Sequence, residues 1–336
     1  MFATIGKQRP IVKSFVLQTY IMTEIKKNIS LKPYTRFQVG GIAESYVEAS
    51  NWRELVEAVT YAKVNELPYY ILAGGSNIAF DDGILPGMVI RFVESPDTDR
   101  LVRVNDTRIE AEANVLLWPF VKYLIERGLA GFERLSGIPG TLGGAVVGNA
   151  GAYGVEIKDY LTRVHILDGD EVRWVGKDEC DFKYRHSIYK EQPWVVLEAE
   201  FNFTNSSPAE LDLISKDTLE RRKKFKWDMK IPGSYFKNLL VKDLSDDVLA
   251  KVDARRFIEG KLPVGYLLES VAAKGYKVGG LTVSDFHANI FLNDGTATYS
   301  DLVELISELK RRVKDKYNID LVEEVRRVDA DSFVRY

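Results

Sequence analysis

The stretch GFERLSGIPGTLGGAVVGNAGAYG, residues 131–154, decides the fold, because it holds eight of the chain's 25 glycines. Glycine loses more backbone freedom on ordering than any other residue, so neither a strand nor a helix favours this composition. Such a segment suits a backbone that approaches a ligand closely or points many amides at one anion. A glycine-rich turn between strands would explain only a few of these glycines. The composition favours a dinucleotide-type cofactor site.

The polar groups within this stretch indicate what the ligand contains. The hydroxyls of Ser136 and Thr141 and the amide of Asn149 suit phosphates, and the ring of Tyr153 suits a flat heterocycle. A second glycine turn, Gly74–Asn77, follows the strand-like run 69–72, and phosphates commonly bind at such strand ends in α/β folds. The two turns are therefore expected to meet around one cofactor.

Neither turn matches the G-x-G-x-x-G dinucleotide fingerprint or the P-loop pattern. Phosphate binding would then rest on backbone amides and on the side chains of Ser76, Asn77 and Thr141. This argues against an ordinary Rossmann dehydrogenase.

Bulk composition sets the class of protein. A length of 336 residues suggests two or three domains, and 46% hydrophobic with 28% charged residues is typical of a soluble globular protein. A net charge of −3 gives no general attraction to nucleic acid or to an anionic membrane. The single cysteine, Cys180, excludes a disulfide framework and fits a reducing cytoplasm. No run approaches the roughly 18 apolar residues of a membrane span, and we expect a monomer.

Periodicity divides the chain into units. Residues 1–24 are interpreted as a loose extension. Residues 25–93 alternate a helix (53–67) with strands (69–72 and 88–92), whereas residues 94–207 contain mainly short β runs and one helix (119–127). A charged helix from about 208 opens the last unit, 208–336. Its longest helix, 299–317, carries an apolar stripe that indicates core packing and begins with a capping-box pattern at Thr298 and Asp301.

Three clusters contain residues suited to chemistry: Arg185 in FKYRHSIY (182–189), Ser234 in GSYFKN (233–238) and Glu324 in EEVRR (323–327). Alone, each has an ordinary explanation as a rim ion pair, a turn residue or a weak surface salt bridge. The three histidines show no metal-ligand spacing, so no metal site is predicted. The basic run 221–230 suits either a solvated helix end or the approach of a phosphate-bearing ligand.

Taken in order, these segments resemble the UDP-N-acetylenolpyruvoylglucosamine reductase family. The matching runs span about residues 30 to 328. They are YTRFQVGG (34–41), AGGSNI (73–78), GIPGTLGG (137–144), NAGAYG (149–154), YRHSIYK (184–190), GSYFKN (233–238), KGYKVGG (274–280), HAN (287–289) and EVR (324–326).

The resemblance implies an α+β fold: a two-lobed FAD-binding module of the vanillyl-alcohol-oxidase (PCMH) type, followed by an α/β substrate-binding domain. The lobes would be residues 25–93 and 94–207, and the domain would be residues 208–336. It implies an NADPH-dependent flavoenzyme that reduces UDP-N-acetylglucosamine enolpyruvate to UDP-N-acetylmuramate for peptidoglycan synthesis. Ser76 stands where related covalent flavoproteins often carry histidine, so FAD is expected to be non-covalent.

The resemblance also implies roles for individual residues. Arg185 and Glu324 would flank the substrate carboxylate and Ser234 would donate the proton. Substrate contacts carry over to Lys224, Asn238, Lys274 and His287. The cofactor-binding residues would be Gly74, Gly75, Ser76, Asn77, Gly137, Ile138, Pro139, Gly140, Thr141, Gly143, Gly144, Asn149, Gly151, Ala152, Tyr153 and Gly154.

Two other functions compete with this one. The same flavin fold serves oxidases of other small substrates, although Ser234, Arg185 and Glu324 argue against that assignment. A non-catalytic module that binds a UDP-sugar or a nucleotide is the other, and failure to bind FAD would favour it.

Overall fold

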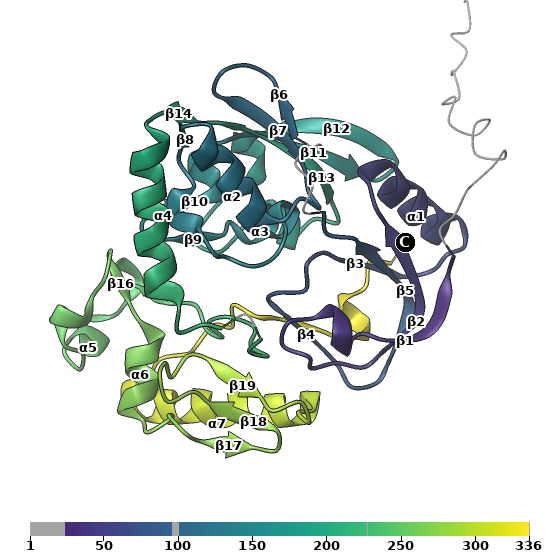
Figure 1. Ribbon diagram of the computed structural model, residues 1–336. Coiled ribbons are helices and arrows are strands. Elements are labelled where there is room, and N and C mark those ends of the chain that lie inside the picture. The colour runs from purple at the N-terminus through teal and green to yellow at the C-terminus, as the bar shows by residue number, and fades with distance from the viewer. Residues whose placement is uncertain (1–23, 96–100, 227, 336) are drawn as a thin grey trace, which may run out of the picture.

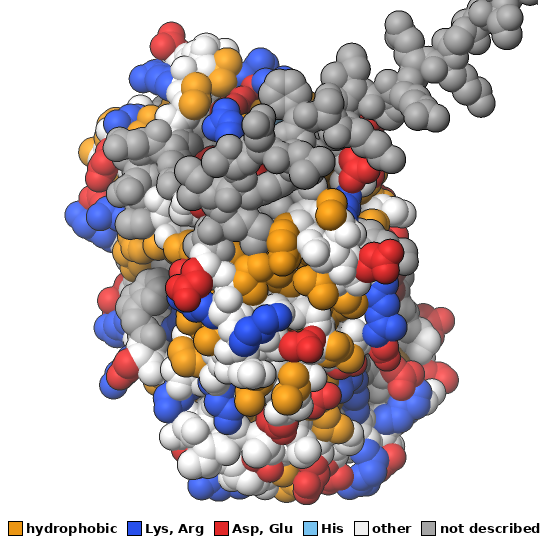
Figure 2. Space-filling model, turned by 90° about the vertical axis from the view of Figure 1, so that its right-hand side faces the viewer, with side chains coloured by type: hydrophobic (Ala, Val, Ile, Leu, Met, Phe, Trp, Pro, Cys, Tyr) orange, Lys and Arg blue, Asp and Glu red, His pale blue; other side chains and the backbone are white. Residues whose placement is uncertain are grey.

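Figure 1 shows the computed structural model of the chain, which describes residues 24–95, 101–226 and 228–335. The buried apolar side chains form three clusters. The first contains residues between 47 and 211, the second contains mainly residues between 235 and 325, and the third contains mainly residues between 31 and 89. The extension expected at residues 1–24 lies, apart from Glu24, outside the described residues. Among the described helices, none has the length and apolar character that a membrane crossing needs. On the face in Figure 2, the described acidic and basic side chains are interspersed.

A four-stranded sheet covered by one helix forms the first unit. The predicted helix is α1 (Trp52–Val64), and the side chain of Asn51 caps it by accepting hydrogen bonds from two amides of its first turn. The sheet order is β1-β2-β5-β3, with β1 antiparallel and the other pairings parallel. The predicted strands 69–72 and 88–92 are confirmed as β3 and the second half of β5, whereas β1 and β2 were not predicted. The strands are β1 (Lys26–Ser30), β2 (Ile42–Ala49), β3 (Tyr69–Leu72) and β5 (Ile84–Phe92).

The second unit is a five-stranded antiparallel sheet in the order β12-β11-β13-β7-β6. Its alternating β runs bury one face under helix α2 (Leu117–Glu126) and the glycine-rich segment, in one continuous apolar cluster. The short β runs predicted for this unit are confirmed. The strands are β6 (Leu101–Arg103), β7 (Arg108–Glu112), β11 (Leu161–Asp168), β12 (Glu171–Gly176) and β13 (Val195–Asn202).

The glycine-rich segment contains a helix, α3 (Leu142–Gly148), which contradicts the expectation that no regular element would form there. Thr141 caps this helix, because its Oγ1 accepts a hydrogen bond from the amide of Gly144 at 3.3 Å. A Cβ on Gly143 would lie 2.7 Å from the Cβ of Ala113. Gly143 is therefore glycine so that the helix can approach the strand-end residue Ala113, and tertiary packing outweighs the low helix propensity.

The third unit packs helix α7 (Tyr299–Tyr317) and helix α6 (Val264–Ser270) against a small sheet, visible at the bottom of Figure 1. The predicted stripe on α7 is buried. The predicted capping box is confirmed, since Thr298 and Asp301 each accept a hydrogen bond from the other's amide. The sheet has the order β17-β18-β19. Its strands are β17 (Lys277–Val278), β18 (Leu281–Val283) and β19 (Phe291–Asn293).

Elements at both ends of the last unit contact the other two units. Helix α4 (Pro208–Arg222) lies on the second unit, where the Oγ atoms of Ser215 and Ser136 are 2.8 Å apart in the interior. The end of the chain returns to the first unit, because β20 (Arg326–Val328) pairs in parallel with β4 (Ile78–Phe80). No local sequence pattern indicates the packing of α4 on the second unit or the pairing of β20 with β4.

Short elements connect the units. They are β8 (Leu129–Ala130), β9 (Gly151–Ala152), β10 (Val155–Glu156), β14 (Thr204–Asn205), β15 (Leu239–Leu240), β16 (Lys261–Leu262) and α5 (Asp246–Leu249).

Candidate active site

The two glycine turns meet, as the sequence predicted. A Cβ on Gly74 would lie 3.0 Å from the Cα of Gly140, so the two backbones are in contact. Gly140 has a φ of +101°, and a Cβ there would lie 2.7 Å from the Oγ of Ser76. Side chains at either position would separate the turns. The result is a surface of bare peptide groups contributed by the first and second units.

The first turn presents donors that suit a phosphate. Gly75 has a φ of +57°, and a Cβ there would overlap the carbonyl oxygen of Tyr34, so only glycine fits. Within the described residues, the amides of Gly75, Ser76 and Asn77 donate to no protein acceptor. Buried or half-buried amides need acceptors, and successive free amides in a turn form an anion site. These residues therefore fit the pyrophosphate of a dinucleotide.

Several side chains expected to touch the cofactor have structural roles instead. The side-chain amide of Asn77 donates through its Nδ2 to the backbone carbonyl of Glu324 at 3.1 Å. That of Asn149 donates to Glu156 Oε2 and to the carbonyl of Lys183. The Thr141 hydroxyl caps α3. The backbones of these three residues remain available to a ligand. Ser136 is wholly buried and does not contribute to the site surface.

Tyr153 is the exposed aromatic side chain of the glycine-rich segment. Its φ is +51°, a conformation that a bulky residue rarely adopts and that often marks a functional site. The guanidinium groups of Arg222 and Arg221 lie 5.5 and 5.9 Å from the centre of its ring. Tyr153 is 37% exposed, so part of the ring remains available to a ligand.

Arg185 and Glu324, far apart in sequence, form an ion pair. The Nε of Arg185 donates to Glu324 Oε1 at 3.0 Å, and the two side chains are 18% and 22% exposed. The other guanidinium nitrogens donate to the carbonyls of Asn149 and Gly151. Arg185 itself has a φ of +55°. These contacts fix the arginine at the edge of the glycine-rich segment.

The electrostatics around this pair favour an anion. Burial raises the pKa of Glu324 above its usual range, even though Arg185 and Lys190 act in the opposite direction. Desolvation of the Lys190 ammonium, with the nearby Lys237, lowers its pKa to about 8. Arg185, Lys190 and Lys237 thus outnumber the carboxylates of Glu324 and Glu156, the second of which lies 3.9 Å from Arg185. Such a site can accept a ligand carboxylate beside Glu324.

Ser234 is exposed, and its hydroxyl has no hydrogen-bond partner among the described residues. Its neighbour Tyr235 links it to the ion pair, because the amide of Glu324 donates to the Tyr235 carbonyl at 2.8 Å. On the other side, Ser234 forms a bridge to Ile290. The structure therefore holds Ser234 and Glu324 on paired backbone segments, with the serine hydroxyl free to act.

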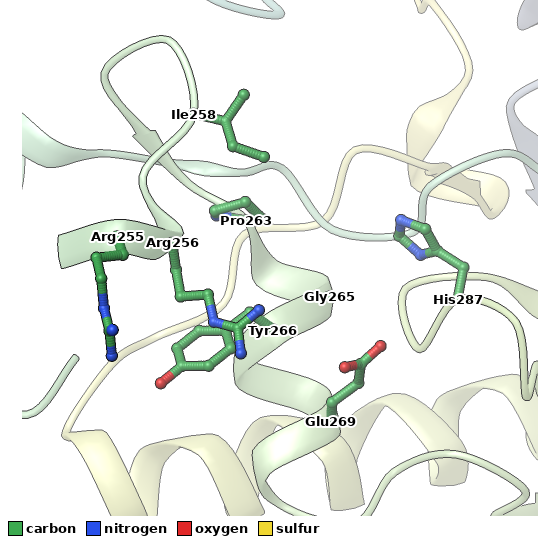
Figure 3. A pocket seen from close by; sticks show the side chains of 8 residues that line it. All are labelled: Arg255, Arg256, Ile258, Pro263, Gly265, Tyr266, Glu269 and His287. Carbon is green, nitrogen blue, oxygen red and sulfur yellow. The ribbon is translucent and has the colours of Figure 1, made fainter. Parts of the chain in front are cut away.

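A cavity of about 300 Å³ lies in the third unit, and of the four residues expected to bind substrate its lining includes His287 (Figure 3). His287 lies beside Gly265, where a Cβ would lie 3.1 Å from the imidazole. Lys274 pairs with the lining residue Glu269 at 2.8 Å. Burial and the nearby Lys224 lower the pKa of His287, so its ring favours the neutral state.

Asn238 is the fourth of these residues, and it is engaged in the fold. Its side-chain oxygen accepts a hydrogen bond from the amide of Val264 at 3.1 Å, at the start of α6. Its side-chain NH₂ makes no hydrogen bond within the described residues and so remains available.

Four residues of the site were not predicted from the sequence: Lys190, Arg222, Arg256 and Tyr266. Lys190 closes a motif already identified, and its Nζ donates to the carbonyl of Arg185. The guanidinium of Arg256 lies 5.3 Å from the centre of the Tyr266 ring on the wall of the cavity (Figure 3). No sequence signal marks Arg256 or Tyr266, and Arg222 is hidden in a basic run.

Comparison with known proteins identifies the two halves of the chain. Residues 226–328 match the family model "UDP-N-acetylenolpyruvoylglucosamine reductase, C-terminal domain", and residues 43–175 match the model "FAD binding domain". A UDP-N-acetylenolpyruvoylglucosamine reductase from Solibacter usitatus is 37% identical over 306 residues, covering 90% of this chain and 96% of that protein. One from Caldanaerobacter subterraneus is 33% identical over 305 residues, covering 89% and 92%.

A solved structure agrees with these matches. The crystal structure of the reductase from Thermus caldophilus superposes with a TM-score of 0.71 at 27% identity, covering 90% of this chain and 98% of that one. The fold is thus the expected α+β arrangement, a PCMH-type FAD-binding module followed by a substrate-binding domain, and FAD is the cofactor. The relatives are reductases rather than oxidases. The chain therefore belongs to the UDP-N-acetylenolpyruvoylglucosamine reductase family of flavoprotein oxidoreductases.

Proposed function

We propose that this enzyme uses NADPH to reduce the enolpyruvyl group of UDP-N-acetylglucosamine enolpyruvate, giving UDP-N-acetylmuramate. The observation that carries the proposal is the convergence of Arg185, Glu324 and Ser234 beside the glycine-rich segment. One carboxylate-binding cation, one carboxyl group with a raised pKa and one free hydroxyl are groups that suit reduction of an enol ether acid.

The backbone of the two glycine turns would hold FAD. Bound FAD supplies the hydride chemistry, carrying the reducing equivalents of NADPH to the enolpyruvyl double bond. The free amides of Gly75, Ser76 and Asn77 would bind its phosphates, with the bare backbone at Gly140 leaving room. Ser76 stands where related covalent flavoproteins often carry the histidine that bonds to the flavin. The attachment of FAD would therefore be non-covalent.

Arg185 and Glu324 would stabilise the substrate carboxylate. Addition of hydride to the terminal carbon leaves negative charge that spreads onto this group. Arginine suits the position because its planar fork binds a carboxylate at two points and stays protonated. Glu324 can stand beside an anion because burial raises its pKa, which favours the neutral acid.

Ser234 would complete the reaction by giving its proton to the carbanionic carbon. A serine hydroxyl is a weak acid in water, but a positioned donor next to a strongly basic carbon is effective. The hydroxyl has no competing partner among the described residues, and the neighbouring backbone is fixed by the Tyr235–Glu324 pairing. Lys224, Asn238, Lys274 and His287 would bind the UDP portion.

The Ser234→Ala variant tests this assignment under anaerobic conditions, with each half-reaction followed by flavin absorbance. Reduction by NADPH should proceed at the normal rate, whereas reoxidation by the enolpyruvyl substrate should slow by about 10²- to 10⁴-fold. The matched control is Ser245→Ala, an exposed serine of the same unit whose side chain makes no capping bond. Equal slowing of both half-reactions, or of neither, would refute the role of Ser234.

A further inference from the structure

Arg222 is a cation without a counter-charge. It is the last residue of α4, half-buried, and within the described residues its guanidinium forms no ion pair. Its Nε is buried and has no acceptor. Arg221, the preceding residue, is exposed and pairs with Asp217 at 2.9 Å. Of two adjacent arginines at one helix end, Arg221 is exposed and ion-paired, whereas Arg222 is half-buried and has no ion pair within the described residues.

The surroundings of Arg222 belong to the active site. Its guanidinium lies 5.5 Å from the centre of the Tyr153 ring, and its Cδ lies 3.6 Å from the position of a Cβ on Gly137. Burial lowers the pKa of Arg222; Tyr153 acts in the opposite direction, and the positive charge of Arg185 adds a smaller lowering. An unpaired, partly desolvated cation is unfavourable for the folded protein.

Local explanations do not account for this placement. A cation at a helix C-terminus interacts favourably with the helix dipole, and an aromatic ring attracts a guanidinium. Arg221 has both advantages, since it occupies the same helix turn and also lies over Tyr153 at 5.9 Å. Neither effect requires that Arg222 be buried without an acid. The missing counter-charge is therefore expected to come from a ligand.

We infer that Arg222 binds an oxyanion of a ligand beside the Tyr153 ring and Arg185, as a further binding residue of this active site. The inference deepens the proposed function and rests on it for the identity of the ligands. A phosphate of FAD and the diphosphate or carboxylate of the UDP-sugar share the required chemistry. All three offer oxygens to the free Nε–H and to the outer nitrogens of the guanidinium.

The test compares Arg222→Met with Arg221→Met. Methionine retains an apolar stem over Gly137, and both variants remove one positive charge from the same helix turn. Three quantities are measured: the Tm of the apoprotein, the Kd of FAD from quenching of flavin fluorescence, and the Kd of UDP-sugars on the holoenzyme from flavin absorbance. The UDP-sugars are the enolpyruvyl substrate without NADPH, and UDP-N-acetylglucosamine, which lacks the carboxylate.

We expect Arg222→Met to weaken at least one ligand by about 10- to 100-fold, the range for a hydrogen bond to a charged group, without lowering the apoprotein Tm. Arg221→Met should change each Kd by less than about twofold, as a screened surface charge does. Weaker FAD alone identifies a cofactor phosphate. Loss of both UDP-sugars identifies the diphosphate, and loss of the enolpyruvyl substrate alone identifies the carboxylate.

Three results would overturn the inference: unchanged Kd values in Arg222→Met, equal losses in the two variants, or a lower apoprotein Tm with normal binding, which would show a purely structural role. If Arg222→Met does not fold, Arg222→Lys decides, because it keeps the charge but loses the fork and should still weaken the same ligand. A wild-type holoenzyme that ignores both UDP-sugars would contradict the proposed function instead, and the FAD measurement would still test Arg222.

Discussion

The two sides of the active site use polar side chains in opposite ways. On the cofactor side, the Thr141 side chain caps a helix and the Asn149 side chain donates hydrogen bonds to neighbouring loops. Backbone amides remain available to the ligand. On the reaction side, the Ser234 hydroxyl is exposed and the guanidinium of Arg185 meets Glu324 at the surface of the site. Backbone shape thus forms the site in one region, and functional groups form it in the other. Damage to the two sides should therefore have different consequences.

After Ser234→Ala, the largest effect is expected from Arg185→Lys on the reaction side. Lysine keeps the charge but cannot bind a carboxylate at two points, and removal of such an oriented donor typically costs about 10²- to 10³-fold in rate. Reduction of the substrate should slow by this amount, while FAD content and Tm stay close to wild type. Stopped-flow absorbance and thermal melts measure the two properties. A large loss of stability would contradict the claim that changes on the reaction side affect rate rather than stability.

On the cofactor side, Gly75→Ala should act through stability. The residue has a φ of +57°, which costs an L-residue about 1–2 kcal/mol, and the new Cβ would overlap the carbonyl of Tyr34. We expect a lower free energy of unfolding in urea and less bound FAD. Gly148→Ala is the control, since its Cβ meets nothing within 4 Å and its φ is ordinary. It should be neutral or stabilising by up to about 1 kcal/mol.

Thr141→Ala refines the same point with a milder change. Loss of the cap of α3 should lower the free energy of unfolding by about 1 kcal/mol. The affinity for FAD should change little, because the backbone rather than the hydroxyl faces the ligand. Urea unfolding of the apoprotein and an FAD titration provide the two numbers. A loss of FAD affinity at unchanged stability would return Thr141 to the set of direct contacts.

The smallest effect is a pH dependence from Glu324. Its folded pKa is raised above the usual 4.5, so the folded state binds more protons than the unfolded state between these two values. Wild-type stability should therefore fall as the pH rises through this interval. Glu324→Gln does not titrate and can still accept a bond from Arg185. The Tm of this apoprotein variant minus that of wild type should grow from pH 4 to pH 8, and a constant difference would contradict the raised pKa.

Much of this fold follows from local pattern. The stripe and capping box of 299–317 predicted α7, and short apolar runs predicted β3, β5 and the strands of the second sheet, whereas β1 and β2 were not predicted. The meeting of the two glycine turns was also predictable from the chemistry that they share. Helix α3 was not, because the reason for Gly143 is its contact with Ala113, which no local rule reveals.

The site divides in the same way. The roles of Arg185, Ser234 and Glu324 were expected from the family resemblance. The structure pairs Arg185 with Glu324 and joins the backbone of Glu324 to that of Tyr235, next to Ser234. The structural use of Asn149, the lowered pKa of Lys190 and the isolation of Arg222 depend on burial and on neighbours from distant segments. Such properties belong to the packed molecule and are not visible in the residue types.

The return of the chain end to the first unit has a consequence for biosynthesis. Strand β20 supplies the neighbour of β4, and Val334 exchanges backbone hydrogen bonds with Tyr69. The Gly74–Asn77 turn precedes β4 directly and is tied to the same C-terminal segment through Asn77. Until residues 326–334 have left the ribosome, that turn lacks its support. The nascent polypeptide should thus acquire its yellow cofactor only after this segment has emerged from the exit tunnel.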